Sequence, residues 1–333
     1  MVVRAVTAAE WGAMSPVQDL ATVENVPHGR TARRLDWLLL PPMVRTLIEG
    51  RLGSPVATAE SAGSGFTPGF ASLLTGRNGA RLFVKAASKK AQRQFADAYR
   101  VEARNLRALP RDLPATRLLW AHEDDLWVIL GFEAVDGGNP VRPWRLDQLH
   151  ACLDVLEEVA DRLAGVTVPL QLNPIHEDIP ALVTGWEQLR TTYPDWPHLE
   201  EAAALAARFP TLPESTSFTH SDARDDNFLV ARDGRVLLCD WNWPCLAPAW
   251  LDTVDLLVAA HGDGLDADAL LGERRLTRDV DPDHVDAWLA AFCGFMLVSR
   301  DRPVPNSSPY LRVHARWYSE VTWSWLAARR GWS

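Results

Sequence analysis

The sequence predicts an α+β fold, with strands concentrated in its first half and helices in its second. Strand-like runs cluster between residues 56 and 132, whereas helical spacing of apolar residues dominates from residue 146 onward. Within the second half, residues 220–240 combine a His-x-Asp-x-x-x-x-Asn pattern, a short hairpin and a further Asp. A chain of 333 residues is long enough for two modest lobes or one large domain.

The first half is predicted to contain one sheet and two helices. An irregular extension, residues 1–40, precedes a helix that follows two prolines and stops at Gly53. An amphipathic helix is expected over residues 89–108. Strand patterns occupy residues 56–62, 70–76, 80–86, 116–121 and 126–132.

The connection between the first two predicted strands, Gly63 to Gly69, is rich in glycine. Missing side chains let backbone N–H groups approach phosphate oxygens, so Ser64 and Gly65 are candidate nucleotide-binding positions. The third glycine lies one residue late for a GxGxxG motif, and Pro68 removes one amide. A plain hairpin connection therefore remains open, although the position two strands before Lys85 favours nucleotide binding.

Lys85 is unusual because the chain has only three lysines against 31 arginines, and it ends a strand whose apolar side chains indicate burial. A buried ammonium needs a partner. Glu102 lies on the apolar face of the predicted 89–108 helix, which is an odd position for a solvated carboxylate. We predict that the two groups pair inside the protein. A surface salt bridge is the alternative, but it need not place Glu102 inward.

The second half is predicted to be mainly helical. Helices are expected over residues 146–164, 180–190, 198–208, 283–299 and 313–330. Another begins near Trp250, and its Asp252 or Asp255 is expected to support the loop at residues 220–227 or to be an ordinary first-turn acid. Trp241, Trp243 and Trp250 suit either stacking on an acceptor or core packing, and both interpretations stay open.

Residues 228–239 are predicted to form a hairpin, because Asp233-Gly234 is a strong signal for a two-residue type I′ turn. That turn pairs Phe228 with Cys239 and sets Asn227 opposite Asp240. Cross-strand partners lie about 5 Å apart at Cβ. Amide and carboxylate oxygens suit Mg²⁺, so the two side chains are candidate metal ligands.

Two side chains in the preceding loop are candidate catalytic groups. Asp222 lies just before the first hairpin strand, where its carboxylate can face an acceptor hydroxyl. Arg224 follows two residues later, where a guanidinium can stabilise charge on a transferring group. Pairing of Arg224 with Asp225 or Asp226 on the loop surface is equally open.

These residues resemble the aminoglycoside phosphotransferase and choline kinase-like family, a small-molecule branch of the protein-kinase-like fold. The family's loop usually contains His-Gly-Asp-x-x-x-x-Asn, followed by Ile-Asp-Trp, and here it is His220-Ser-Asp222 to Asn227, followed by Cys239-Asp-Trp. The resemblance covers roughly residues 41–260. Ser221 replaces the usual Gly, and Asp226 stands where Gly is common.

The resemblance implies a role for each motif. Asp222 would be the catalytic base, and Asn227 and Asp240 would hold Mg²⁺. Lys85, held by Glu102, would bind the α- and β-phosphates. The backbone around Glu133 and Val135 would be the hinge that contacts a purine edge.

The fold that the resemblance implies has two lobes. After the extension at 1–40, residues 41–136 would form a nucleotide-binding lobe with an antiparallel sheet. Residues 137–333 would form a mainly helical lobe with the catalytic loop and the acceptor pocket.

Charge and composition limit the partners. Residues 1–136 carry 17 Lys and Arg against 14 Asp and Glu, whereas residues 137–333 carry 17 against 29. A basic first part suits nucleotide phosphates and an acidic second part suits a cationic acceptor, although acidity that only aids solubility stays open. The acidic chain without a basic stripe argues against nucleic-acid binding.

Other features argue against a membrane or secreted protein. No stretch approaches the roughly 20 apolar residues of a membrane span, and the N-terminus does not resemble a signal peptide. Four cysteines without Cys-x-x-Cys pairing indicate reduced thiols and a cytoplasmic location. Oligomeric state has no signature in the sequence.

The sequence therefore predicts a kinase that uses ATP and Mg²⁺ to phosphorylate a hydroxyl of a small molecule. An aminoglycoside or another amino-sugar-like or cationic molecule is a candidate acceptor, and GTP stays open as the donor. The alternative is a catalytically silent nucleotide-binding regulatory module of the same fold. A regulated protein kinase is disfavoured, because the next helix begins only about ten residues after Asp240.

Overall fold

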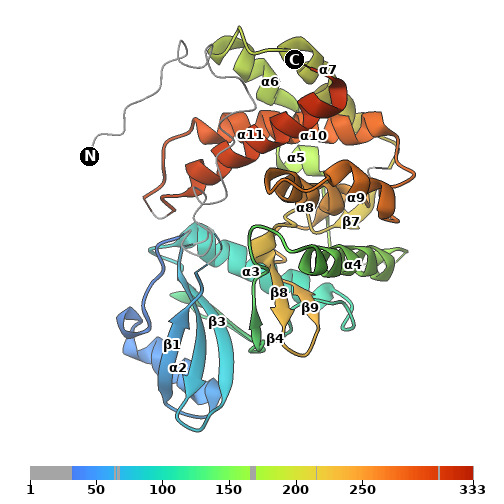
Figure 1. Ribbon diagram of the computed structural model, residues 1–333. Helices are drawn as coiled ribbons and strands as arrows, with labels where there is room; N and C mark the ends of the chain where they lie inside the picture. The colour runs from blue at the N-terminus through green and yellow to red at the C-terminus, as the bar shows by residue number, and fades with distance from the viewer. Residues whose placement is uncertain are drawn as a thin grey trace.

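The computed structural model describes residues 32–63, 65, 68–165, 170–214, 216–306 and 308–332. The chain folds into two lobes (Figure 1). A sheet with helices α2 and α3 forms the N lobe, at the lower left of the figure, and a larger set of helices forms the C lobe above it. The predicted α+β, two-lobed fold is confirmed.

The N lobe is built on one antiparallel sheet with the strand order β1-β2-β3-β5-β4. Its strands are β1 (Val56–Ser61), β2 (Phe70–Gly76), β3 (Arg81–Ser88), β4 (Leu118–Glu123) and β5 (Trp127–Phe132). All five were predicted from the sequence, with ends that shift by one or two residues. Burial explains why the apolar pattern of β5 was strong in the sequence, since every residue of this strand is buried.

Helices and the end of the N-terminal extension pack on this sheet. Helix α2 (Pro42–Leu52) lies on one face with η2 (Trp37–Leu39), and Trp37 and Leu40 join the core of the lobe. Helix α3 (Arg93–Ala108) packs on the other face. The predicted start of α3 at residue 89 is wrong, because the Lys89 N–H donates to Leu126 O and extends the sheet instead.

The C lobe contains two small sheets among its helices. A three-stranded sheet has the order β6-β8-β9, and β7 pairs with β10. The elements are β6 (Gly137–Gly138), α4 (Leu146–Leu163), α5 (Ile175–Asp178), α6 (Ala181–Thr192), α7 (Leu199–Arg208), η3 (Phe209–Thr211), β7 (Ser217–Thr219), η4 (Asp225–Asn227), β8 (Phe228–Ala231), β9 (Val236–Leu238), β10 (Cys245–Ala247), α8 (Leu251–Gly262), α9 (Ala267–Glu273), α10 (Pro282–Arg300) and α11 (Leu311–Arg330).

The long helices α10 and α11 lie side by side across the C lobe (Figure 1). Together with α6 and α8 they bury much of the tryptophan content. Trp241 and Trp250 also belong to this core, which favours packing over acceptor stacking for these two residues. Trp243 is different, because 64% of its surface is exposed.

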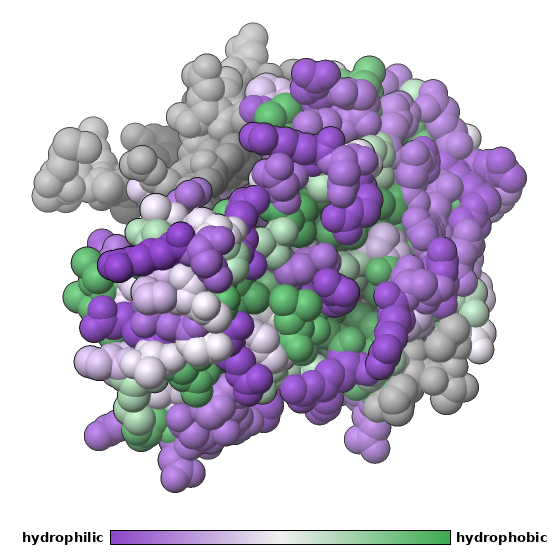
Figure 2. All heavy atoms as spheres, turned by 90° about the horizontal axis from the view of Figure 1, so that it is seen from below, coloured by the Kyte–Doolittle hydropathy of each residue, from purple (hydrophilic) through white to green (hydrophobic). Residues whose placement is uncertain are grey.

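One face of the molecule is mostly polar (Figure 2). Seen from below, hydrophilic side chains dominate, and apolar side chains show mainly toward the middle of the face (Figure 2). No helix in the described ranges combines the length and apolar character that a membrane span requires. All four cysteines are free thiols.

Candidate active site

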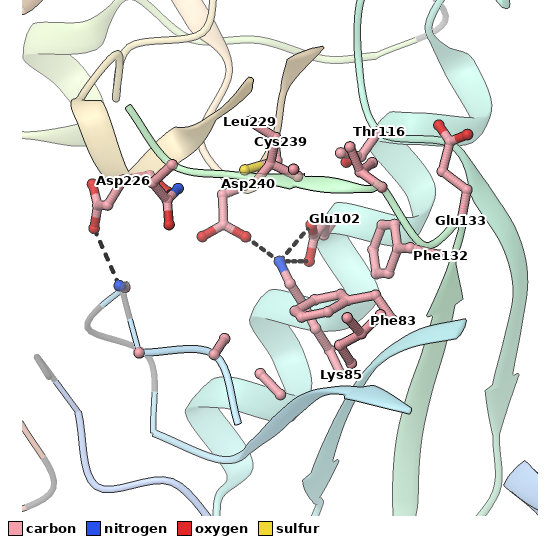
Figure 3. Close-up of a pocket in the computed structure, with 18 of the residues that line it drawn as sticks. Phe83, Lys85, Glu102, Thr116, Phe132, Glu133, Asp226, Leu229, Cys239 and Asp240 are labelled. Carbon is pink, nitrogen blue, oxygen red and sulfur yellow. Dashed lines mark hydrogen bonds and ion pairs between the residues drawn. The ribbon is translucent and has the colours of Figure 1, made fainter. Parts of the chain in front are cut away.

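A pocket of about 220 Å³ lies between the lobes, and both lobes line it. The N lobe contributes β2, β3 and α3, and the C lobe contributes the residues around β8 and β9. In Figure 3, Asp226 and Glu133 lie at opposite ends of this pocket, and Lys85 lies between them. The pocket therefore spans the candidate catalytic loop and the candidate hinge.

Lys85 is held by two carboxylates at the centre of the pocket (Figure 3). Its Nζ lies 2.8 Å from Glu102 Oε1 and 3.0 Å from Glu102 Oε2, and it also contacts Asp240 Oδ1. Glu102 is buried in α3, with 1% of its side chain exposed. The predicted inward pairing of Lys85 and Glu102 is thus present in the structure, and the surface alternative is excluded.

The electrostatics keep Lys85 charged. Burial alone would lower the pKa of this ammonium, but Asp240 and Glu102 outweigh it and hold the pKa well above its ordinary value. In the same way, burial favours a higher pKa for Asp240, and Lys85 reverses this so that the pKa is lowered. These effects favour a charged ammonium at Lys85 and an ionised carboxylate at Asp240.

Asp252 fixes the backbone at the start of the catalytic loop. Its two carboxylate oxygens accept from the N–H groups of His220, at 2.8 Å, and Ser221, at 2.7 Å. His220 Nε2 in turn lies 2.9 Å from Cys239 O. Of the two acids expected to support this loop, Asp252 does so, and Asp255 instead accepts from Trp288 Nε1 at 2.7 Å.

Asp222 and Asn227 face one another within this loop. The Asn227 amide donates to Asp222 O at 2.8 Å and to Asp222 Oδ2 at 3.0 Å. Burial raises the pKa of Asp222 to about 6, although Arg224 acts to lower it. At neutral pH the carboxylate is therefore ionised and able to accept a proton.

Arg224 is paired with loop carboxylates. Its Nε lies 3.0 Å from Asp226 Oδ1 and one terminal nitrogen lies 3.0 Å from Asp222 Oδ1. The alternative partner, Asp225, instead contacts Arg142 at 3.2 Å. Arg224 thus pairs with the candidate base, and a role on a transferring phosphoryl group would require it to leave Asp222.

The hairpin that carries Asn227 and Asp240 is present, but its predicted register is wrong by one residue. Phe228 pairs with Leu238, and the Cys239 N–H donates to Asn227 O at 2.8 Å. The reason is a three-residue turn: the Ala231 N–H bonds Arg235 O, and Gly234 alone takes a positive φ, of 90°. Asn227 therefore faces Cys239, one residue before Asp240.

The side chains of Asn227 and Asp240 nevertheless fit a divalent cation. Asn227 Oδ1 is buried and has no hydrogen-bond partner in the described structure. Buried polar atoms are almost always satisfied, so this oxygen is suited to accept a metal ion or a water molecule. Within the described ranges, no group of three or more His, Cys, Asp or Glu side chains is arranged to hold a metal ion by itself. Further ligands to a metal at Asn227 and Asp240 would be phosphate oxygens and water.

Gly65 connects the glycine-rich segment to the catalytic loop. Its N–H donates to Asp226 Oδ2 at 3.2 Å, so a backbone donor of this segment already faces an anionic oxygen (Figure 3). Gly65 has a φ of 84°, which side chains rarely tolerate. Ser64, the other candidate in this segment, lies outside the described residues.

Glu133 and Val135 line the opposite end of the pocket. The Glu133 N–H donates to Arg117 O at 3.0 Å, and Glu133 Oε1 accepts from the Arg117 N–H at 2.9 Å. These two bonds hold the segment that follows β5 in place. The apolar side chains of Phe132 and Leu229 complete the walls here.

Sequence reasoning missed two arginines that belong to this site. Arg142 is buried beneath the catalytic loop, where it binds Asp225 and, with two bonds of 2.6 Å, Asp263. Arg34 lines the pocket itself. Their partners lie 28 or more positions away in the sequence, so no local pattern could have found them.

Comparison with known proteins gives a consistent result. The model of the phosphotransferase enzyme family matches residues 60–290, more than half of the chain. No curated protein matches.

Solved structures with the same fold were found. The choline kinase LicA from Streptococcus pneumoniae has a TM-score of 0.54 at 14% identity, covering 86% of this chain and 98% of its own. An aminoglycoside phosphotransferase from Alicyclobacillus acidocaldarius has a TM-score of 0.56 at 15% identity, covering 88% and 96%. Macrolide 2'-phosphotransferase MphH from Brachybacterium faecium has a TM-score of 0.54 at 16% identity, covering 82% and 95%. The chain belongs to the phosphotransferase enzyme family.

Proposed function

We propose that this protein transfers the γ-phosphoryl group of ATP to a hydroxyl group of a small molecule. One observation carries the proposal. Lys85 and Asp240 line one pocket between the lobes, and Asp226 lines it from the loop that carries the Asp222–Asn227 pair. These are the groups that phosphoryl transfer requires.

The purine would lie at the Glu133 end of the pocket. The backbone of Glu133 and Val135 would contact its edge, between the side chains of Phe132 and Leu229. ATP is the preferred donor in this proposal, and GTP is the alternative to test. The triphosphate would then extend toward Lys85 and Gly65.

Asn227 and Asp240 would hold Mg²⁺. Bound there, the ion would neutralise charge on the phosphate oxygens. Lys85 would keep the α- and β-phosphates in place, because Glu102 fixes its ammonium. Lys85 would have to leave Asp240 when the nucleotide binds, and Glu102 would keep it in position.

Asp222 would act as the base. Its carboxylate would accept the proton of the acceptor hydroxyl while the oxygen attacks the γ-phosphorus and the bond to the β-phosphate oxygen breaks. The acidic balance of residues 137–333 supports a cationic acceptor. The similarity to a choline kinase and to aminoglycoside phosphotransferases supports the same acceptor class.

The experiment is a panel of hydroxylated amines and aminoglycosides incubated with ATP and Mg²⁺, with a mass gain of one phosphate as the measurement. Parallel reactions with GTP decide the donor. Transfer to at least one acceptor supports the proposal. ATP binding without transfer or hydrolysis would instead support the silent regulatory module, although the presence of Lys85, Asp222 and both metal-ligand candidates disfavours it.

A further inference from the structure

Arg34 belongs to the segment before the first helix, yet it is tied to the glycine-rich connection between β1 and β2. Arg34 Nε donates to Ala62 O at 3.0 Å, and a terminal nitrogen lies 3.5 Å from Gly65 O. The next residue, Leu35, donates its N–H to Gly69 O at 3.0 Å. The end of the extension is therefore held against both ends of that connection.

These contacts bring the guanidinium to the wall of the nucleotide pocket. Arg34 lines the pocket together with Lys85 and Asp240. Arg34 is thus a second cation of the pocket wall, contributed by a different segment from Lys85.

The position along the pocket indicates which part of the nucleotide Arg34 faces. Gly65 accepts from Arg34 through its carbonyl and donates its N–H to Asp226 of the catalytic loop. Asp226 lies at the end of the pocket opposite Glu133 (Figure 3). Arg34 therefore lies nearer the phosphate end than the purine end.

We propose that Arg34 binds the phosphates of the nucleotide and that the segment just before η2, residues 32–36, is thereby part of the nucleotide site. This inference rests on the proposed function, because it assumes a nucleoside triphosphate in the same pocket. It gives this end of the extension a role in ligand binding that its irregular sequence did not suggest.

Charge at the phosphate end explains the need for such a residue. Glu102, Asp222, Asp226 and Asp240 contribute four carboxylates there, whereas Lys85 and Arg224 contribute two cations. A triphosphate brings further negative charge, so an additional cation favours its binding. A guanidinium has five donors and can hold carbonyl oxygens and a phosphate oxygen at the same time.

The test is the affinity of the Arg34→Ala variant for ATP, ADP and AMP, measured by calorimetry with Mg²⁺ present. We expect the affinity for ATP to fall about tenfold, equivalent to about 1.4 kcal/mol. AMP affinity should change less than about twofold, because AMP lacks the outer phosphates. Arg33→Ala is the matched control, since Arg33 is exposed and lies outside the pocket.

A second variant distinguishes phosphate binding by Arg34 from a purely structural role in holding the glycine-rich connection. Arg34→Lys keeps the charge but loses the planar fork, so it should recover part of the affinity for ATP. Equal losses for ATP and AMP in Arg34→Ala, or unchanged ATP affinity, would overturn the proposal. Failure of the unaltered protein to bind any nucleotide would overturn the proposed function itself, and this inference with it.

Discussion

Lys85 and Arg224 are both cations between carboxylates at the site, but they are held in different ways. Lys85 pairs with Glu102, a buried acid on a separate helix that has no other partner among the described residues. Arg224 pairs with Asp226, two residues away on the same loop, and with the candidate base Asp222. Each cation also contacts a carboxylate of the proposed chemistry, Asp240 for Lys85 and Asp222 for Arg224. The difference lies in the other partner, because among the residues that the structure describes Glu102 serves Lys85 alone, whereas Asp226 also accepts from the Gly65 N–H.

The difference separates a preorganised group from one that must rearrange. In the proposed mechanism Glu102 would keep Lys85 in place if Asp240 held a metal, so Lys85 would need little reorganisation when nucleotide binds. A role of Arg224 on the transferring phosphoryl group would require it to leave Asp222.

The largest effect on activity is expected from removing the carboxylate of Asp222, which pairs with Arg224. Asp222→Ala deletes the proposed base, and kcat should fall by about 10²- to 10⁴-fold. ATP affinity should persist within about threefold, because Lys85 and its Glu102 partner are untouched. Steady-state kinetics and calorimetry measure the two quantities.

The control for Asp222→Ala is Asp233→Ala, which removes an exposed acid from the hairpin turn. It should leave kcat unchanged. Near-normal turnover in Asp222→Ala would remove the base assignment.

Glu102→Gln and Asp226→Asn form a matched pair, because each removes one carboxylate from one of the two cations. Glu102→Gln leaves a buried ammonium with Asp240 alone, and kcat/KM for ATP should fall about 10- to 100-fold. Asp226→Asn leaves Arg224 with Asp222 in a partly exposed site, so the change should be about threefold or less. Equal losses in the two variants would contradict the distinction between the cations.

Arg224→Gln tests the link between Arg224 and the base through pH. Burial raises the pKa of Asp222 to about 6 and Arg224 acts to lower it. The base is active only when ionised, so activity falls as pH falls through this pKa. Without Arg224 the pKa rises, and the acid limb of the kcat profile should move to higher pH. Profiles from pH 5 to 8 at saturating ATP measure this, and an unmoved limb would show that Arg224 does not act on Asp222.

Most of the fold could be predicted because its signals are local. Alternating and helical patterns identified every strand of the N-lobe sheet and the long helices α4, α10 and α11. Ends were less certain, because they depend on partners from elsewhere: Lys89 extends a strand only because Leu126 O lies opposite its N–H. The hairpin register failed for a similar reason, since Asp-Gly allows both a two-residue and a three-residue turn.

The site was predictable wherever one short motif contains the chemical groups. Asp222 and Asn227 lie five residues apart on one loop. Lys85 could be identified because the apolar strand that it ends indicated burial, and the structure buries most of its side chain. Arg34 and Arg142 had no such signal. Arg142 binds Asp263 across 121 residues, so only the folded chain brings them together.

Backbone strain is found in the catalytic loop, at Ser221. Removing this strain gives the smallest effect that we predict. Ser221, where the family usually has Gly, adopts a φ of 61°, whereas Lys85 lies in a regular strand. Its hydroxyl donates to Trp243 O, which offsets part of the cost of this left-handed backbone, roughly 1–2 kcal/mol for a residue with a Cβ.

Ser221→Ala and Ser221→Gly isolate that strain. Both variants lose the hydroxyl bond, but only Gly tolerates the positive φ without steric cost. Ser221→Gly should therefore be more stable than Ser221→Ala by about 1 kcal/mol in denaturant unfolding, after allowance for the greater freedom of unfolded Gly. An alanine variant as stable as the glycine one would mean that the loop relaxes its backbone, so that the support from Asp252 does not hold Ser221 in this conformation.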